Sequence, residues 1–283
     1  MARLLKGAPV ADAILRNAAE RTEALKGKGT VPTLAILRVG ARQDDISYEN
    51  GASKKCAAAG VAVKKAVLPG DAEPELFFDT LESLNADTSV HGILMFRPLP
   101  KHLDEEKARQ LLSPEKDVDG CTDISLAGVF TDTKHGFAPC TAEAVMEMLA
   151  YYGIETAGKH AVILGRSTSV GRPAAMLLMH KNATVTVCHS KTQKMESFAR
   201  EADILISAIG KPEYVSGVFL SPGQTVIDVG INWNDQKQKL CGDVLFEEAD
   251  AIVSALTPVP GGVGAVTSAL LVKHTVEACE RQL

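Results

Sequence analysis

The segment 160–192 constrains the fold of this 283-residue chain more than any other, and it reads HAVILGRSTSVGRPAAMLLMHKNATVTVCHSKT. An apolar run at 161–164 leads into a polar turn at 165–171, and a helix-like stretch then leads to a β-branched run at 183–187. This order predicts a strand, a turn, a helix N-terminus and a parallel strand, which together bind the phosphates of a dinucleotide. The turn reads G-x-S-x-x-V-G instead of G-x-G-x-x-G, so an ordinary strand–turn–helix of an α/β protein stays open as an alternative.

The end of the second run indicates which dinucleotide fits. NAD-binding units carry Asp or Glu about 20 residues beyond the glycines, where it holds the ribose 2′-hydroxyl. Here residues 187–191 read VCHSK and contain no acid. Arg166, Ser190 and Lys191 would attract a 2′-phosphate instead, the alternative being that they are solvated loop residues. The sequence therefore favours NADP, with NAD the less favoured cofactor.

Bulk properties exclude several classes of protein. The chain is 46% hydrophobic and 23% charged, which is typical of a soluble globular protein. Its net charge of −5 gives no reason to expect a nucleic acid or a membrane as partner. We expect no signal peptide, since the N-terminus has no long apolar core; the sequence has no membrane-length apolar run, and the six cysteines form no C-x-x-C pair. We therefore expect reduced thiols, a cytoplasmic location and no metal site.

The pattern of apolar residues predicts an α/β protein of two domains. In the first half, helices are expected over 11–25, 47–59 and 74–84, strands over 33–39, 61–68 and 92–96, and a loop-rich stretch over 116–137. The second half has β-branched runs every 20–26 residues, which predicts a parallel sheet covered on both faces. We expect one domain over 1–147 plus a C-terminal helix at 266–283, a second domain over 148–265, and a ligand in the cleft between them.

Several blocks together resemble the methylenetetrahydrofolate dehydrogenase/cyclohydrolase family, from about residue 30 to the C-terminus. The blocks that carry this resemblance are the helix from Tyr48 to Gly60, HGILMFRPLP (91–100), PEKDVDG (114–120), APCT (138–141), GRSTSVGRP (165–173), ATVTVCHSKT (183–192), ADILISAIGKP (202–212), VIDVGIN (226–232), GDV (242–244) and TPVPGGVGAVT (257–267). The resemblance implies a folate-binding catalytic domain and a Rossmann-like NADP-binding domain, paired as a homodimer through the nucleotide domain. It implies oxidation of 5,10-methylene-tetrahydrofolate to the 5,10-methenyl form in one-carbon metabolism, followed in most members by hydrolysis to 10-formyl-tetrahydrofolate.

The resemblance also assigns roles to single residues. Tyr48 and Asp119 are the expected catalytic pair: Tyr48 stacks on the folate, and Asp119 accepts hydrogen bonds from the pterin N–H groups, whereas Asp117 is structural. A core aromatic and a turn-forming Asp are the alternatives. The other expected substrate-binding residues are Phe96, Pro98, Pro260, Gly261 and Gly262. The expected cofactor-binding residues are Gly165, Arg166, Ser167, Val170, Gly171, Ser190, Gly210 and Ile231, for which turns and strand-end packing are the alternative.

Two departures from the family pattern concern the hydrolysis step. The family has Tyr-x-x-x-Lys, but Ala52 stands four residues after Tyr48. The family reads G-I-L-V-Q-L-P-L-P, but Phe96 stands at the place of the Gln that hydrogen-bonds that Lys. The two positions lost their polar partners together, which is less destabilising than leaving one buried group unpaired.

The two reactions need different help from the protein. Hydride transfer depends mainly on holding two rings at near-attack distance, whereas hydrolysis needs a base and a stabilised adduct. We therefore expect a dehydrogenase with little or no cyclohydrolase activity. The alternatives are a bifunctional enzyme, in which Lys55 or bound water replaces the missing Lys, and a non-catalytic folate- or nucleotide-binding protein.

Overall fold

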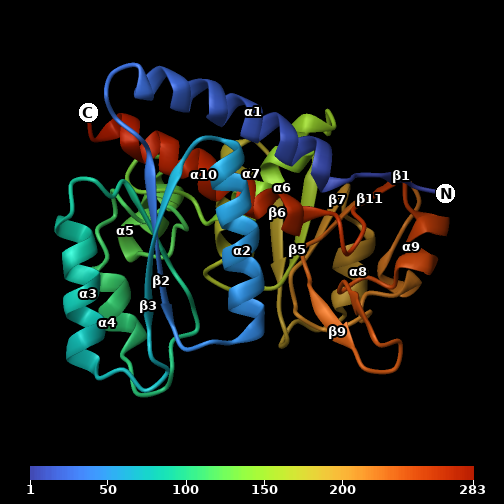
Figure 1. Cartoon of the computed structure of the whole chain (residues 1–283). Coiled ribbons are helices and arrows are strands. Elements are labelled where there is room, and N and C mark those ends of the chain that lie inside the picture. Colours follow the sequence, from blue (N-terminus) through green and yellow to red (C-terminus); the bar gives the residue numbers. More distant parts are fainter. The chain divides into compact units, whose positions relative to one another are not determined.

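The computed structural model describes all 283 residues and divides them into two compact units. The six-stranded unit contains Met1–Ala11 and Thr141–Thr267, and the three-stranded unit contains Asp12–Cys140 and Ser268–Leu283. Each unit consists of strands alternating with helices along the chain (Figure 1). The prediction of two α/β domains, one of them with a Rossmann-like parallel sheet, is confirmed.

The six-stranded unit is built on one sheet in which every neighbouring pair of strands is parallel. Its strands, in spatial order, are β1 (Arg3–Leu4), β11 (Ala255–Leu256), β8 (Thr225–Asp228), β7 (Ile204–Ser207), β5 (His160–Leu164) and β6 (Thr184–Cys188). Its other elements are the helices α6 (Cys140–Tyr151), α7 (Gly171–His180), α8 (Met195–Arg200) and α9 (Phe246–Ile252), a 3₁₀ turn η1 (Gly217–Phe219), and a hairpin of β9 (Asn232–Asn234) and β10 (Lys239–Cys241). The burial of strands with β-branched apolar residues on both faces is typical of such sheets.

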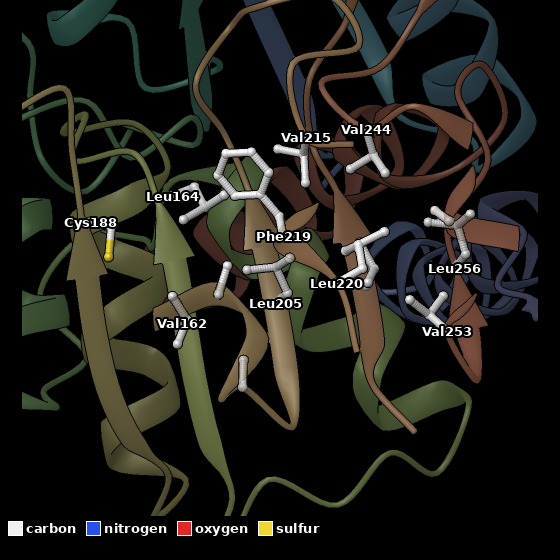
Figure 2. Packing of buried hydrophobic residues seen from close by; sticks show 14 residues of the cluster. Val162, Leu164, Cys188, Leu205, Val215, Phe219, Leu220, Val244, Val253 and Leu256 are labelled. Atoms are coloured by element: carbon white, nitrogen blue, oxygen red, sulfur yellow. The ribbon is translucent and has the colours of Figure 1, made fainter. Parts of the chain in front are cut away.

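One face of this sheet is covered by short helices. Figure 2 shows Val162 and Leu164 of β5 and Leu205 of β7 on that face, with Phe219 of η1 close to them. The same cluster includes Ala199 of α8, so helices and strands share one core. Burying each large apolar side chain stabilises the unit by about 1.5–3 kcal/mol.

The three-stranded unit has a smaller parallel sheet in the order β3-β2-β4. The strands are β2 (Thr33–Val39), β3 (Ala62–Leu68) and β4 (Gly92–Met95), and the helices are α2 (Gln43–Ala58), α3 (Pro74–Ala86), α4 (Glu105–Leu111) and α5 (Asp123–Thr131). Leu37 of β2 packs with Phe77 of α3 and Ala108 of α4, and α2 lies on the opposite side of the sheet (Figure 1). The longer helices α1 (Gly7–Lys26) and α10 (Val263–Arg281) include residues of both units.

The structure differs from the sequence-based expectation at the domain boundaries. We expected divisions at 147/148 and 265/266, with residues 1–11 in the first domain, whereas the units divide at 140/141 and 267/268. Residues 1–11 belong to the six-stranded unit because β1 pairs in parallel with β11, with Arg3 opposite Ala255. Such a pairing joins residues far apart in the sequence and leaves no local pattern.

The expectation of a loop-rich stretch over 116–137 is wrong, because this stretch contains α5. The helix is capped locally: the Thr122 hydroxyl accepts a hydrogen bond from the N–H of Ser125 at 3.1 Å. A hydroxyl in this position satisfies one of the N–H groups that a helix leaves free at its start. Thr122 is thus an N-terminal signal that a stretch of mixed polar and apolar residues obscured.

None of the six cysteines forms a disulfide, and all six are buried. Burial raises the pKa of the Cys56 thiol to about 12 and that of Cys279 to about 11. None of the helices is both long and apolar enough to cross a membrane.

Candidate functional site

The turn after β5 is held by its own backbone and one hydroxyl. Ser167 Oγ accepts hydrogen bonds from the N–H groups of Val170 at 3.2 Å and Gly171 at 3.4 Å. A Cβ at Gly171 would collide with the carbonyl oxygen of Gly165, and Gly165 itself has φ +121°. Only glycine meets both demands, so these residues make a tight turn at the N-terminus of α7.

A cavity of about 380 Å³ opens beside this turn and brings three of the predicted cofactor-binding residues together. It is lined by Gly165, Arg166, His189, Ser190, Thr192, Lys194, Met195, Glu196, Ala208, Ile209, Lys211 and Tyr214. Arg166 and Ser190 are exposed, so their polar groups are available to a ligand. Lys191, which we expected beside Ser190, is not among the lining residues, and its N–H instead donates to His189 Nδ1 at 3.2 Å.

Sequence reasoning missed two cations of this cavity. Lys194 precedes α8 and has a left-handed backbone, with φ +53°. Lys211 follows β7, and its ammonium lies 4.9 Å from the ring centre of Tyr214. With Arg166, three cations stand against the single carboxylate of Glu196, so the cavity favours an anionic ligand. The K-x-x-Y spacing of Lys211 and Tyr214 is the only signal that the sequence offers for this pair.

A second cavity of the same unit, of about 300 Å³, joins residues that we had assigned to different ligands. Ile231, expected at the cofactor, lines it together with Pro260, Gly261 and Gly262, expected at the substrate. Ile231 is 62% exposed, so its side chain is free to contact a ligand. Residues 258–265 line this cavity; they form the loop before α10 and the first residues of that helix.

Gly210, also expected at the cofactor, lines neither cavity, and a buried carboxylate holds it in place. Asp243 accepts hydrogen bonds from the backbone N–H groups of Ile209 at 2.8 Å, Gly210 at 3.3 Å and Lys211 at 3.0 Å. It also accepts from the Ser207 hydroxyl at 3.2 Å and the Asn232 amide at 2.9 Å. Asp243 therefore fixes the loop after β7 and, through Asn232, the residue next to Ile231.

A second buried carboxylate supports the first. Asp228, at the end of β8, accepts from the N–H groups of Gly230, Asp243 and Val244 at 2.9–3.0 Å. Burial raises the pKa of Asp228 to about 7, against the lowering effect of these three donors. Sequence reasoning missed both residues, although they stand in the blocks VIDVGIN and GDV.

In the three-stranded unit, the expected substrate-binding residues lie near the end of β4. The N–H of Phe96 donates to Leu37 O at 3.0 Å, which extends the pairing with β2 one residue beyond β4. The Phe96 ring is buried and lies edge-on to Tyr48 of α2, with ring centres 5.9 Å apart. Pro98 is exposed. The structure thus brings Tyr48 and Phe96 together.

The KDVDG block runs beside β4 and separates the roles of its two acids. Asp117 is fully buried and accepts from the N–H groups of Cys121 and Thr122 and from the Ser125 hydroxyl, at 2.7–3.0 Å. Asp119 instead faces Arg97, with Oδ2 3.4 Å from Nη2. Burial raises the pKa of the Asp119 carboxyl, and the Arg97 guanidinium opposes this rise. The hydrogen bonds of Asp117 therefore hold the loop together, whereas one carboxyl oxygen of Asp119 is available to a ligand.

The position expected to hold a lysine in this family is closed. Ala52 of α2 is 0% exposed. Lys55, one turn further, reaches α10, where its ammonium donates to Ser268 Oγ at 2.6 Å. Burial lowers the pKa of Lys55, and Asp12 opposes this effect. No cluster of three or more His, Cys, Asp or Glu side chains in the chain could hold a metal ion.

Comparisons with known proteins also divide the chain into a nucleotide-binding part and a catalytic part. Residues 139–283 match the NAD(P)-binding domain of tetrahydrofolate dehydrogenase/cyclohydrolase, and residues 5–119 match its catalytic domain. The chain is 52% identical over 281 residues to the bifunctional protein FolD of Carboxydothermus hydrogenoformans, covering 99% of this chain and 98% of that protein.

Two solved structures extend the comparison to three dimensions. The bifunctional FolD methylenetetrahydrofolate dehydrogenase/cyclohydrolase of Campylobacter jejuni has a TM-score of 0.96 and 36% identity, with 100% of both chains covered. The Trypanosoma brucei N5,N10-methylenetetrahydrofolate dehydrogenase-cyclohydrolase, solved in complex with NADP cofactor and inhibitor, has a TM-score of 0.93 and 36% identity, covering 99% of this chain and 98% of that chain.

The role of Asp243 generates a prediction. Asp243→Asn replaces one acceptor oxygen by an amide that faces donors, and leaving a buried donor unpaired costs about 1–3 kcal/mol. We expect the free energy of unfolding in urea to fall by this amount and the KM for the nicotinamide dinucleotide to rise. Asp235→Asn, in an exposed loop, is the control. Unchanged stability in the Asp243 variant would show that the five donors find other partners.

Proposed function

Because the chain belongs to the tetrahydrofolate dehydrogenase/cyclohydrolase family, we propose that it oxidises 5,10-methylene-tetrahydrofolate to the 5,10-methenyl form with NADP, in the one-carbon metabolism of the cytoplasm. The observation that carries this proposal is the cavity at the end of the parallel sheet, where the turn residue Gly165 lies with Arg166 and Ser190. NADP, when bound, supplies the nicotinamide ring that takes the hydride. The protein's own task is to bind and orient two ligands.

The folate would be held by the three-stranded unit. The Tyr48 ring is half-buried against Phe96, which fixes its orientation and leaves part of the ring for stacking. The Asp119 carboxylate would accept hydrogen bonds from the amino and ring N–H groups of the pterin. The proposed set of substrate contacts also includes Pro98, Pro260, Gly261 and Gly262. The last three line the smaller cavity of the six-stranded unit.

An absorbance assay with methylene-tetrahydrofolate and NADP tests the proposal, since NADPH and methenyl-tetrahydrofolate both absorb. NADP-dependent formation of the methenyl product supports it. Binding of both ligands without turnover would favour a non-catalytic binding protein instead.

The choice of cofactor is predicted from Arg166, Ser190, Lys194 and Lys211 around one cavity. We expect kcat/KM to be higher for NADP than for NAD. Arg166→Ala should lower the value for NADP by about 10- to 150-fold, the worth of a hydrogen bond to a charged group, and change that for NAD little. Steady-state kinetics with both cofactors measures this.

Arg172→Ala is the matched control for this variant, because Arg172 is an exposed arginine of α7 outside the cavity. A wild-type preference for NAD would contradict the 2′-phosphate assignment. Equal losses for the two cofactors in Arg166→Ala would contradict it as well.

We further propose that hydrolysis of the methenyl product is absent or very weak. At positions 52 and 96, where the family pattern has Lys and Gln, this chain carries a methyl group and a phenyl ring, both buried. Neither side chain can accept a proton from water or pair with a base. The site therefore keeps its means of binding the folate and lacks an acid–base group at these positions.

A bifunctional dehydrogenase/cyclohydrolase is the second candidate, because relatives such as the Carboxydothermus protein are named bifunctional. Lys55 is the residue of α2 that could serve as the base, since burial lowers its pKa and so increases the neutral fraction of its amine. Its ammonium, however, donates to Ser268 at 2.6 Å. That bond directs Lys55 to α10.

The sharpest prediction separates the two candidates. With the wild-type protein, methenyl-tetrahydrofolate should accumulate and then decay at the rate seen without enzyme, because general acid–base help is worth about 10²–10⁴-fold. Ala52→Lys alone should not restore hydrolysis, since a buried ammonium beside Phe96 has no partner. Ala52→Lys with Phe96→Gln should restore part of it. The decay of methenyl absorbance measures each rate.

Fast hydrolysis by the wild-type protein would contradict this proposal and support the bifunctional one. Lys55→Met would then abolish it if Lys55 is the base. Lys54→Met, one residue away on the exposed side of α2, is the matched control.

We also propose a homodimer that forms through β6. This strand is an outer strand of the six-stranded sheet, and Val187 on it is 37% exposed. Unpaired edge strands are ready sites of association. Light scattering should give a mass twice the 30.0 kDa of one chain. The Val187→Lys variant should shift the measured mass towards that of a single chain. Val31→Lys, an exposed valine of the other unit, should not. A monomeric wild-type protein would exclude this interface.

A further inference from the structure

Two parallel segments place Arg97 beside Asp119, the carboxylate that we propose binds the folate. Asp117 bridges to Ile93 of β4 in parallel register, so Asp119 runs alongside the end of β4, which Phe96 and Arg97 follow. The Arg97 side chain is 23% exposed and that of Asp119 is 27% exposed. Both groups are thus partly shielded and partly open at the same place.

The contact between the two side chains leaves both with unused capacity. Nη2 and Oδ2 are 3.4 Å apart, whereas a charge-assisted hydrogen bond typically spans about 2.7–2.9 Å. The other oxygen of Asp119 accepts no hydrogen bond from the protein, and Arg97 Nε is buried without a partner. The pair therefore stands side by side, as an acceptor next to a donor.

This arrangement matches one edge of the pterin ring. In a reduced pterin the ring N3–H, a donor, stands next to the C4 carbonyl oxygen, an acceptor. We propose that Arg97 is a substrate-recognition residue that donates to this carbonyl while Asp119 accepts from the neighbouring N–H. The inference rests on the proposed function and adds a group to it, because the family pattern has a leucine at this position, which offers no donor.

Arg97 has a second effect, on the charge of Asp119. Burial and Asp117 raise the pKa of Asp119, whereas Arg97 and His274 of α10 lower it. Arg97 in turn faces Cys121, Asp119 and Glu105. Without the guanidinium, the pKa of Asp119 rises further, so the carboxylate is lost at a higher pH as the solution is acidified. The acid limb of kcat/KM for the folate then moves to higher pH.

The test compares two competitive inhibitors of the wild-type enzyme, tetrahydrofolate and its 4-amino analogue, in which the C4 carbonyl is replaced by an amino group. In the analogue the 4-amino group presents a donor to the Arg97 donor and ring N3 carries no hydrogen for Asp119, so the wild-type enzyme should strongly prefer tetrahydrofolate. The change in this preference when Arg97 is replaced isolates the contribution of the arginine. Arg97→Leu should reduce the ratio of the two Ki values by about 10- to 150-fold, leave the KM for NADP unchanged and shift the acid limb upwards. Arg97→Met carries the same expectation, so either variant that folds suffices.

Two controls define the outcome. Arg97→Lys keeps a charged donor and should retain part of the preference. Arg109→Met removes an arginine of nearly equal exposure, 24%, that pairs with Asp123 on the same unit, and should leave the ratio unchanged. An unchanged Ki ratio in Arg97→Leu, with the wild-type enzyme active, overturns the inference and leaves the proposed function intact. An inactive wild-type enzyme overturns the proposed function itself.

Discussion

The parallel register of its sheet is the constraint on which the six-stranded unit depends. Leu164 of β5 pairs with Cys188 of β6 and Ser207 of β7, and Ser207 pairs with Asp228 of β8. All four strands therefore end at one edge, and their following loops meet there. Loops that leave a sheet together bring free N–H groups to one place, which suits an anion. The Asp243 carboxyl group accepts hydrogen bonds from such N–H groups within the protein, and it thereby fixes the backbone of the loop after β7.

The elements that sequence reasoning predicted well are those whose signal is local. Val162 to Leu164 and the other β-branched runs form buried strands because burial of such residues outweighs other local preferences. β1 had no such signal, since Arg3 and Leu4 are exposed and only the distant β11 makes them a strand. The boundary of the unit followed that long-range pairing.

The same distinction holds for the candidate sites. Arg166 and Ser190 were predictable because a turn and a strand end place them a fixed number of residues apart. Lys211 joins their cavity from the end of another strand, and chain position alone gives no indication of this. Arg97 stands in the block HGILMFRPLP, which gives it no role of its own, although its side chain meets a carboxylate 22 residues away. Side-chain meetings between loops depend on the register of the strands that precede them, which a single sequence does not specify.

The burial of the six thiols has a consequence for how this protein's motions can be observed. A cysteine reacts with an alkylating reagent only as the thiolate, which is the nucleophile, and only when the reagent reaches it. Cys56 and Cys279 are 0% exposed, and burial holds their pKa values far above neutral. Each is therefore silent until its surroundings open, and the two sit on different helices, α2 and α10. The rates at which Cys56 and Cys279 are alkylated therefore measure how often each helix opens locally, and no probe has to be introduced.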